Sequence, residues 1–310
     1  MTAGAARLRL GTRGSPLALR QSGLVAAEIE RRGTSVELVA IRTSGDVASG
    51  SLATLGGKGL FVKEIEQALS TGEIDLAVHS LKDMPADLPP GLILAATPPR
   101  ADPRDVLITS EGRGLGELLA GTRIGTSSLR RRALIAAVRP DLEVVPLRGN
   151  VETRLGKLAA FEVDAVILAA AGLARLGLQP NGAVPLPVRT FVPAIGQGIL
   201  ALETRADDRA ANAVVARLDD PATHAAAAAE RAFLAAVGGD CHTPLAAYAE
   251  VTRGRVRLTA LVADPDGRAL LGDTLEGDAA EAPGIGRRLA EALLSRGASD
   301  IVARARRQHA

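Results

Sequence analysis

The chain has 310 residues, of which 47% are hydrophobic and 23% charged, so it can build two or three domains with sizeable cores. Its 37 basic and 35 acidic residues nearly balance, which excludes the charge asymmetry of a bulk polyanion binder. A single cysteine excludes a disulfide framework within the chain and any cysteine-based zinc cluster. The four histidines show no ligand spacing, so no metal site is predicted.

The sequence contains no run of about 18 apolar residues that could span a membrane. Its first residues lack the uninterrupted apolar stretch of a signal peptide, so we expect a cytoplasmic protein. The sequence has four phenylalanines, one tyrosine and no tryptophan. These aromatic side chains are too few to form a stacking platform for nucleic-acid bases. A nucleic-acid binder is therefore a distant alternative.

Residues 1–98 alternate short apolar runs with helical patterns, which is typical of β–α units. Ser15 followed by Pro16 predicts a helix N-terminus, and Gly33 predicts the end of that helix. A second helix is expected over residues 60–70. The predicted strands of this part are 8–12, 36–42, 74–80 and 92–97.

After residues 98–105 the β–α pattern starts again. Helices are expected near 128–138 and 151–161. The predicted strands of this second part are 106–109, 122–126, 142–148 and 164–170. A segment rich in proline and glycine, 185–198, then leads into one more strand at 199–205.

Beyond residue 217 the pattern changes to an alanine-rich helix, three alternating segments and a final helix. These elements are expected at 223–237, 246–251, 255–263, 269–277 and 284–297. The fold class is therefore α/β, with two doubly wound α/β domains and a small C-terminal α+β domain built on a three-stranded antiparallel sheet. The predicted domains are 1–98 with 199–216, 99–198, and 217–310.

Two basic corners occur where strands lead into helices of the second part. In GTSSLRRRAL, Ser128 can cap a helix whose first turns carry Arg130 and Arg131, where cations oppose the helix dipole. In LRGNVETRL, Arg148 and Arg154 repeat the arrangement. Arginine forks grip carboxylates or phosphates, so an anion site is one interpretation and a solvated basic face is the other.

The stretch VHSLKDMP, residues 78–85, ends a predicted buried strand with polar residues. In α/β sheets ligands bind beyond the carboxyl ends of strands, so Ser80, Lys82 and Asp83 are expected to face a cleft. The alternative for Asp83 is a turn aspartate before a proline. The glycine-rich stretch GGKGLF, residues 56–61, lacks the spacing of a phosphate-binding P-loop.

The single cysteine lies in AVGGDCHTPLAAY, residues 236–248. A lone thiol cannot form a disulfide within the chain, so packing, reactivity and covalent attachment are the possible roles for Cys241. A buried structural cysteine is common in general, but a Gly-Gly-Asp turn fits that role poorly.

The ordered set of motifs resembles the porphobilinogen deaminase family, also called hydroxymethylbilane synthases. The motifs are GTRGSPLAL, GGKGLFVKE, DLAVHSLKDMP, DPRD, GTSSLRRRA, LRGNVETRL, AAAGLARLGL, PAIGQG and the late cysteine. They cover nearly the whole chain. The resemblance implies two periplasmic-binding-protein-like α/β domains and the third, smaller domain.

The resemblance also implies a reaction and a cofactor. Family members join four porphobilinogen molecules head to tail with release of ammonia, which gives the linear tetrapyrrole hydroxymethylbilane. They carry a dipyrromethane cofactor as a thioether on a cysteine, which matches Cys241. Porphobilinogen is then the small-molecule partner of a monomer that uses no metal, membrane or nucleic acid.

By the same resemblance, Asp83 is the catalytic acid, which stabilises positive charge and relays protons. The matched residues divide into two groups. Cofactor binding is expected of Cys241, Lys82, Asp83, Ser128, Arg130, Arg131 and Arg154. Substrate binding is expected of Arg13, Ser15, Lys58, Phe61, Ser80, Arg148, Arg175 and Gln197. Arg132 is expected to face solvent.

Two residues depart from the family pattern. Thr54 stands where some members have a lysine, which removes one contact to a substrate acid. Asp240 precedes Cys241 where many members have glycine or serine, and its carboxylate should raise the pKa of the thiol and slow attachment. The main alternative function is a non-catalytic anion receptor, because two α/β domains joined by crossing segments also describe periplasmic binding proteins.

Overall fold

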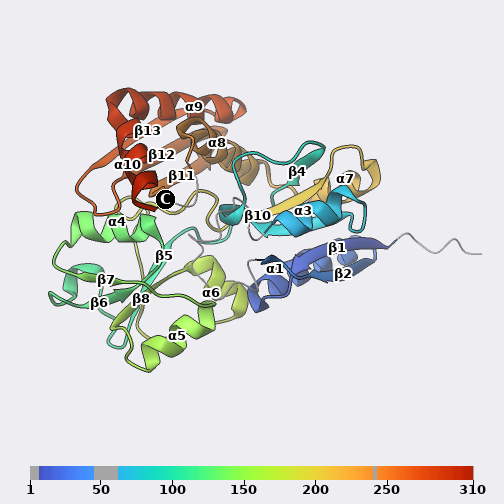
Figure 1. Cartoon of the computed structure of the whole chain (residues 1–310). Coiled ribbons are helices and arrows are strands. Elements are labelled where there is room, and N and C mark those ends of the chain that lie inside the picture. Colours follow the sequence, from blue (N-terminus) through green and yellow to red (C-terminus); the bar gives the residue numbers. More distant parts are fainter. Residues whose placement is uncertain (1–6, 45–61, 240–242, 310) are drawn as a thin grey trace, which may run out of the picture.

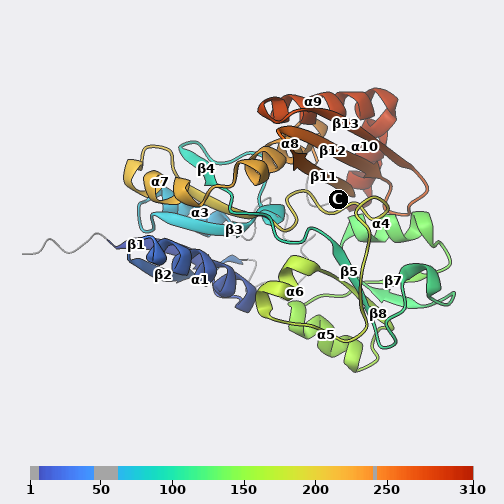
Figure 2. The same ribbon diagram turned by 180° about the vertical axis from the view of Figure 1, so that it is seen from behind.

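The computed structural model of the chain describes residues 7–44, 62–239 and 243–309. These described residues form three sheets, two of five strands and one of three. Figures 1 and 2 show each sheet with its own helices, and the third sheet lies next to helix α4 of the second. Five residues singled out in the sequence lie outside the described residues: Thr54, Lys58, Phe61, Asp240 and Cys241.

The first sheet has the strand order β2-β1-β3-β10-β4. Its strands are β1 (Leu8–Arg13), β2 (Val36–Ile41), β3 (Leu76–Ser80), β4 (Leu92–Ala96) and β10 (Leu200–Arg205). β1 is parallel to β2 and β3, whereas β10 runs antiparallel between β3 and β4. The last strand to join this sheet therefore comes from more than a hundred residues further along the chain.

Helices cover both faces of the first sheet. They are α1 (Pro16–Arg31), α3 (Lys63–Ser70) and α7 (Arg209–Val215). Side chains alternate along β3, so Leu76 and Val78 pack in one cluster with α1 and α7, while Ala77 packs with α3 on the other face. Because both faces of β3 are buried, apolar residues follow one another along the strand instead of alternating with polar ones.

The second sheet repeats this plan with the order β7-β6-β8-β5-β9. Its strands are β5 (Asp105–Thr109), β6 (Arg123–Gly125), β7 (Glu143–Val145), β8 (Ala165–Ala169) and β9 (Ala183–Pro185). Helix α4 (Leu129–Val138) covers one face, and α5 (Val151–Ala159) and α6 (Ala170–Leu176) cover the other.

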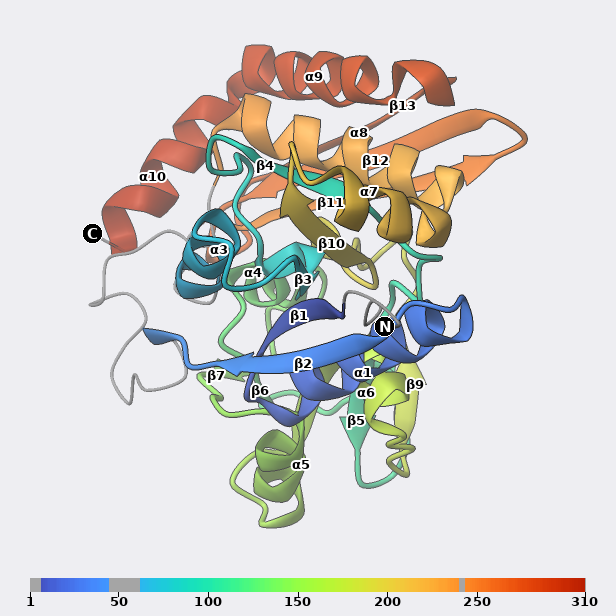
Figure 3. The same cartoon turned by 90° about the vertical axis from the view of Figure 1, so that its right-hand side faces the viewer.

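The third sheet is the antiparallel meander β11 (Leu245–Thr252), β12 (Arg255–Ala263) and β13 (Leu270–Asp278). Helices α8 (Pro221–Val237) and α9 (Ala282–Leu293) cover one face, with Phe233 fully buried between them and the sheet. Helix α10 (Ser299–His309) follows a π-helical turn, Leu294–Ala298. Figure 3 shows α8 beneath α9 on the side that faces the first sheet.

Three short 3-10 helices matter less for the architecture: Leu115–Glu117, Ala216–Leu218 and Ala279–Glu281. A fourth, η1 (Leu81–Asp83), follows β3 directly and belongs to the site described below. Among the helices of the described part of the chain, none has the length and apolar character needed to cross a bilayer.

Two connections join the first and second sheets, residues 97–104 and 186–199, and both are tied to α8. Glu230 of α8 is fully buried and pairs with Arg100 of the first connection at 2.6 Å. The same carboxylate accepts hydrogen bonds from the backbone N–H of Gly196 in the second connection and of Ala249 in β11. One buried ion pair thus links all three units.

We expect Glu230→Gln to lower the free energy of unfolding by about 3–5 kcal/mol, because it leaves the largely buried guanidinium of Arg100 without its counter-charge. Urea denaturation measures the loss. The matched control is Glu111→Gln, in an exposed pair with Arg113, which should cost about 1 kcal/mol or less. Equal losses in the two variants would contradict a special role for the buried pair.

The three-part plan and most strands agree with the sequence predictions. The predicted strand 142–148 is shorter, ending at Val145, and four elements were missed: β9, α6, α7 and α10. The domain boundaries stay a prediction, which strand membership supports because β10 returns to the first sheet.

Candidate active site

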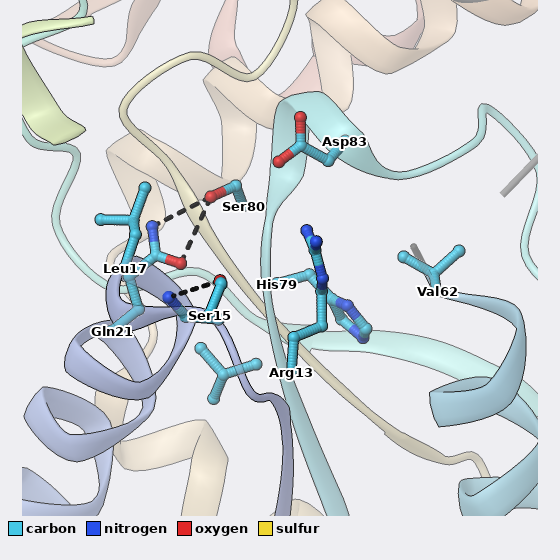
Figure 4. A pocket seen from close by; sticks show the side chains of 10 residues that line it. Arg13, Ser15, Leu17, Gln21, Val62, His79, Ser80 and Asp83 are labelled. Atoms are coloured by element: carbon cyan, nitrogen blue, oxygen red, sulfur yellow. Dashed lines mark hydrogen bonds between the residues drawn. The ribbon is translucent and has the colours of Figure 1, made fainter. Parts of the chain in front are cut away.

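A pocket opens at the carboxyl ends of β1 and β3, beside the N-terminus of α1 (Figure 4). β1 and β3 are parallel neighbours, so their last residues meet at one edge of the sheet. The pocket is lined by Arg13, Ser15, Leu17, Ala18, Gln21, Val62, Val78, His79, Ser80 and Asp83. Four residues predicted to bind substrate or act in catalysis therefore lie together: Arg13, Ser15, Ser80 and Asp83.

Two of the pocket hydroxyl groups are held by hydrogen bonds from helix α1. Gln21, which is buried, donates from Nε2 to Ser80 Oγ at 2.9 Å. Ser15 caps the helix by accepting from the Ala18 backbone N–H at 3.4 Å. The guanidinium of Arg13 points toward the side of the pocket on which Asp83 lies (Figure 4). Gln21 has no signal of its own in the sequence, so its role was missed.

The turn that carries Asp83 is fixed by its two apolar flanks. Leu81 and Met84 are buried, and Lys82 and Asp83 between them are exposed. The Leu81 backbone N–H donates to the Ile199 carbonyl at 3.0 Å. The apolar flanks therefore orient the two polar side chains of η1 away from the core.

The second connection passes very close to this turn. Gly196 has φ +72°, and a Cβ there would lie 2.8 Å from Leu81 Cγ. Only glycine fits this close approach without displacing the turn. The glycine of the PAIGQG motif thus lets the connection pack directly beneath the Asp83 turn.

A buried acid–imidazole cluster lies behind the pocket wall. His79 Nε2 is 3.0 Å from Glu203 Oε2, and both side chains are almost completely buried. Glu66 of α3 lies nearby, and burial together with the charge of Glu203 raises its pKa. The sequence reasoning missed this cluster, because nothing local marks His79 as a pocket residue.

The second unit presents the first basic corner, whose charges act on Lys82 of the first unit. The region where these charges meet is termed the cleft. Arg130 and Arg131 are 5% and 6% exposed, and both pair with Asp105, the fully buried first residue of β5. Arg130 Nη2 and Arg131 Nη2 lie 2.7 Å from separate oxygens of that carboxylate. Each arginine also donates to a main-chain carbonyl, of Val192 and Ile167 respectively, at 2.8 Å.

This arrangement corrects the expectation of two freely available arginine forks. Asp105 occupies one side of both guanidinium groups, and the sequence did not single it out beyond the DPRD motif. Burial opposes ionisation of Asp105, but Arg130 and Arg131 outweigh burial and hold its pKa well below the ordinary value. Ser128 caps α4, accepting from the Arg131 backbone N–H, as predicted. Arg132 is exposed, in agreement with the expectation.

The cleft still holds more positive than negative charge. Lys82 reaches solvent, yet its pKa is lowered, first because protein atoms displace water around it and also because Arg130 and Arg131 repel its charge. The charges of Asp83 and Asp105 act in the opposite direction. The first and second units therefore face each other through Lys82 and the two arginines.

Three more predicted arginines belong to the second unit. Arg154 donates from Nε to the Gly149 carbonyl at 2.9 Å, and burial followed by the charge of Arg131 lowers its pKa. Arg175 at the end of α6 donates to the Gly198 carbonyl at 2.7 Å, and burial lowers its pKa to about 10. Arg148 is exposed, between β7 and α5.

Gln197 lies on the second connection, as predicted, and reaches into the arginine cluster. Its Nε2 donates to the Pro103 carbonyl at 2.7 Å and to Asp105 Oδ1 at 3.1 Å. Gln197 Oε1 and Arg130 Nε are both buried, and within the described ranges neither has a hydrogen-bond partner. One donor and one acceptor are thus left for a further group.

Two family models match the chain over most of its length. The first, porphobilinogen deaminase, dipyromethane cofactor binding domain, matches residues 8–213. The second, porphobilinogen deaminase, C-terminal domain, matches residues 224–295. The chain belongs to the porphobilinogen deaminase family.

Relatives carrying that name are similar over almost the whole chain. A porphobilinogen deaminase of Syntrophotalea carbinolica is 52% identical over 299 residues, which cover 96% of this chain and 95% of the relative. One of Syntrophobacter fumaroxidans is 49% identical over 298 residues, covering 95% and 96%. Among solved structures, the periplasmic aliphatic sulphonate binding protein SsuA of Escherichia coli matches with a TM-score of 0.41 and 15% identity, covering 74% of this chain and 70% of that one.

The residues at the cleft fit the dipyrromethane cofactor that the porphobilinogen deaminase family model names. Each of its rings carries two carboxylates, and the cleft gathers Lys82, Arg130, Arg131 and Arg154, where neighbouring arginine charges help to lower the pKa values of Lys82 and Arg154. An anionic ligand would relieve this repulsion. In the described part of the chain, no group of histidines and carboxylates is arranged to hold a metal ion.

Proposed function

We propose that this protein is a transferase that condenses four porphobilinogen molecules into hydroxymethylbilane, with release of ammonia at each step. The observation that carries the proposal is a cleft with more cations than carboxylates, beside an exposed aspartate, in a chain that matches both porphobilinogen deaminase domains. Each pyrrole added brings further carboxylates, which such a cleft is suited to hold. The cytoplasmic location and monomeric state stay predictions.

We assign the cofactor's carboxylates to Lys82, Arg130, Arg131 and Arg154, and its thioether to Cys241. When bound, the dipyrromethane supplies the free pyrrole carbon to which the first substrate is joined. Arg130 and Arg131 each pair with Asp105 and donate to a carbonyl, so both guanidinium groups are held in a fixed orientation. Ser128 supports them as the cap of α4.

Substrate carboxylates are assigned to the other basic and hydroxyl side chains around the cleft. Arg13, Ser15 and Ser80 line the pocket with Asp83, and Arg175 lies at the second connection. Arg148, Gln197, Lys58 and Phe61 complete the proposed set. Asp83 is the group proposed to stabilise positive charge on the pyrrole as ammonia leaves and to accept the proton lost on condensation.

Intact-protein mass spectrometry tests the proposal. The purified protein should exceed its sequence mass by two porphobilinogen units less two molecules of ammonia, one lost as the thioether forms and one as the second ring is joined. Cys241→Ala should remove both the extra mass and the activity. Cys241→Ser is the matched control for side-chain size, and it should behave like the alanine variant. Wild-type protein of unmodified mass that is fully active would overturn the cofactor assignment, and unmodified protein without activity would favour an anion receptor.

A further inference from the structure

Helix α8 holds the main chain that follows the proposed catalytic aspartate. Arg231 donates from Nη1 to the Pro85 carbonyl at 2.9 Å and from Nη2 to the Ala86 carbonyl at 2.7 Å. These carbonyls belong to the second and third residues after Asp83. Arg231 directly follows Glu230, the residue that ties both connections to the third unit. Adjacent side chains of one helix therefore hold the connections and the catalytic turn.

The position of Arg231 is costly for a cation, which argues for a specific use. Burial lowers its pKa, while the charges of Glu203 and Asp87 favour the protonated form. A guanidinium is planar and rigid, so two N–H groups on neighbouring carbonyls fix both the distance and the orientation of that segment. Neither carbonyl is part of a helix or strand, so no ladder of backbone hydrogen bonds performs this task.

The same helix also packs on the other side of the turn. Ala227, one helical turn before Arg231, is fully buried in a cluster with Leu81 and Met84, the apolar residues that flank η1. Contacts from α8 thus reach the segment before and after Asp83. Asp83, which lies between Leu81 and Met84, lines the pocket.

We propose that Arg231 is a positioning residue for Asp83, which sets how far the carboxylate reaches into the pocket. The inference rests on the proposed function, because it assigns Arg231 a role through the catalytic aspartate. Helix α8 ends at Val237, and Gly238 caps it in the left-handed region at φ 67°. Because Cys241 follows three residues later in the sequence, one helix links the catalytic turn to the segment that carries the cofactor.

The test compares Arg231→Met with Arg139→Met. Arg139 also clamps a loop, donating to the Leu115 and Leu118 carbonyls at 2.7 Å, but it lies away from the pocket. We expect Arg231→Met to lower kcat at least tenfold, with KM changed less than about threefold and the cofactor mass retained. Hydrogen exchange of residues 81–88 should speed up in this variant alone.

Arg231→Lys keeps the positive charge, and its ammonium group can reach one of the two carbonyls, so this variant should recover part of kcat. It also keeps the test possible if Arg231→Met fails to fold. Combining the lysine variant with Asp83→Glu tests whether the two residues act together. If Arg231 acts through Asp83, the double variant will lose less kcat than the product of the two single losses. The reason is that Asp83→Glu has already altered how far the carboxylate reaches into the pocket.

Several outcomes would overturn the inference. One is a double variant of Arg231→Lys and Asp83→Glu whose loss of kcat equals the product of the two single losses. Another is an equal effect of Arg231→Met and Arg139→Met on kcat. Either result would make Arg231 a stabilising residue only. Failure of the proposed function looks different, because the wild-type protein itself would then form no hydroxymethylbilane. If Asp83 has no catalytic role, Asp83→Ala will stay active whatever Arg231 does.

Discussion

Replacing Asp105 with alanine is expected to lower the free energy of unfolding by about 3–5 kcal/mol. The carboxylate is fully buried and pairs with Arg130 and Arg131, which are 5% and 6% exposed, so its removal leaves two buried guanidinium groups without their counter-charge. Chemical denaturation at neutral pH measures the loss. The matched control is Asp102→Ala, on the connection just before β5, whose carboxylate forms a partly exposed pair with Arg104. This variant should cost about 1 kcal/mol or less.

The pH dependence gives this prediction a second readout. Because the folded state holds the pKa of Asp105 below its unfolded value, the carboxylate contributes stability above the unfolded pKa and loses it as pH falls toward the folded pKa. Wild-type protein should therefore lose more stability than Asp105→Ala between neutral pH and about pH 3, near the ordinary pKa of aspartate. Parallel stability curves for the two proteins would contradict the assignment.

Replacing Asp105 should also change cofactor loading, because its carboxylate holds the guanidinium groups of Arg130 and Arg131 in one orientation. We expect Asp105→Asn, which keeps the shape of the side chain, to fold and yet carry a smaller fraction of cofactor by intact mass. Full loading in Asp105→Asn would show that the forks do not depend on this carboxylate.

Local signals in the sequence were sufficient for the parts of the site that begin helices. Ser15 and Ser128 each cap a helix, and each was predicted from its own side chain and the residues just after it. The strand ends that form the pocket also followed from short apolar runs. These features depend on contacts within a few residues, which a sequence pattern records directly.

The pairing of Asp105 could not be predicted in this way. DPRD contains two aspartates, and the segment itself does not distinguish half-buried Asp102 from fully buried Asp105. Their difference arises from the antiparallel pairing of β5 with β8 and from arginines 25 and 26 residues further along the chain. The sequence therefore marks Arg130 and Arg131 as candidate anion-binding residues but does not show that both guanidinium groups already pair with Asp105.

The missed elements have similar physical reasons. Helix α6 starts after Ala169, which offers no capping side chain, and it contains a glycine, Gly172, whose nearest neighbours are Leu17 and Val151. A glycine in so short a helix weakens the helical pattern. The packing of α6 against α1 is tertiary information that the local pattern does not record. Strand β9 has three residues and ends in Pro185, so its edge pairing with β5 leaves too short a pattern to detect.

Replacing Asp83 with alanine is expected to lower kcat by about a hundred- to ten-thousand-fold, the usual cost of losing a positioned acid or base. Asp83 is exposed at the pocket, so the variant should keep its free energy of unfolding within about 0.5 kcal/mol and retain the cofactor mass. Asp83→Glu should lose far less activity, because the charge survives with a different reach.

The control for this substitution is Asp87→Ala, an exposed carboxylate four residues further along the same segment that does not line the pocket. It should change kcat less than about threefold, because it contacts no reacting atom. The measurement is the rate of hydroxymethylbilane formation, followed together with intact mass so that loss of cofactor is separated from loss of chemistry. Near-normal turnover by Asp83→Ala would leave Asp83 as a turn aspartate, and the stabilisation of positive charge would then have to come from another carboxylate facing the cleft. Asp105 is a poor substitute, because Arg130 and Arg131 already neutralise it.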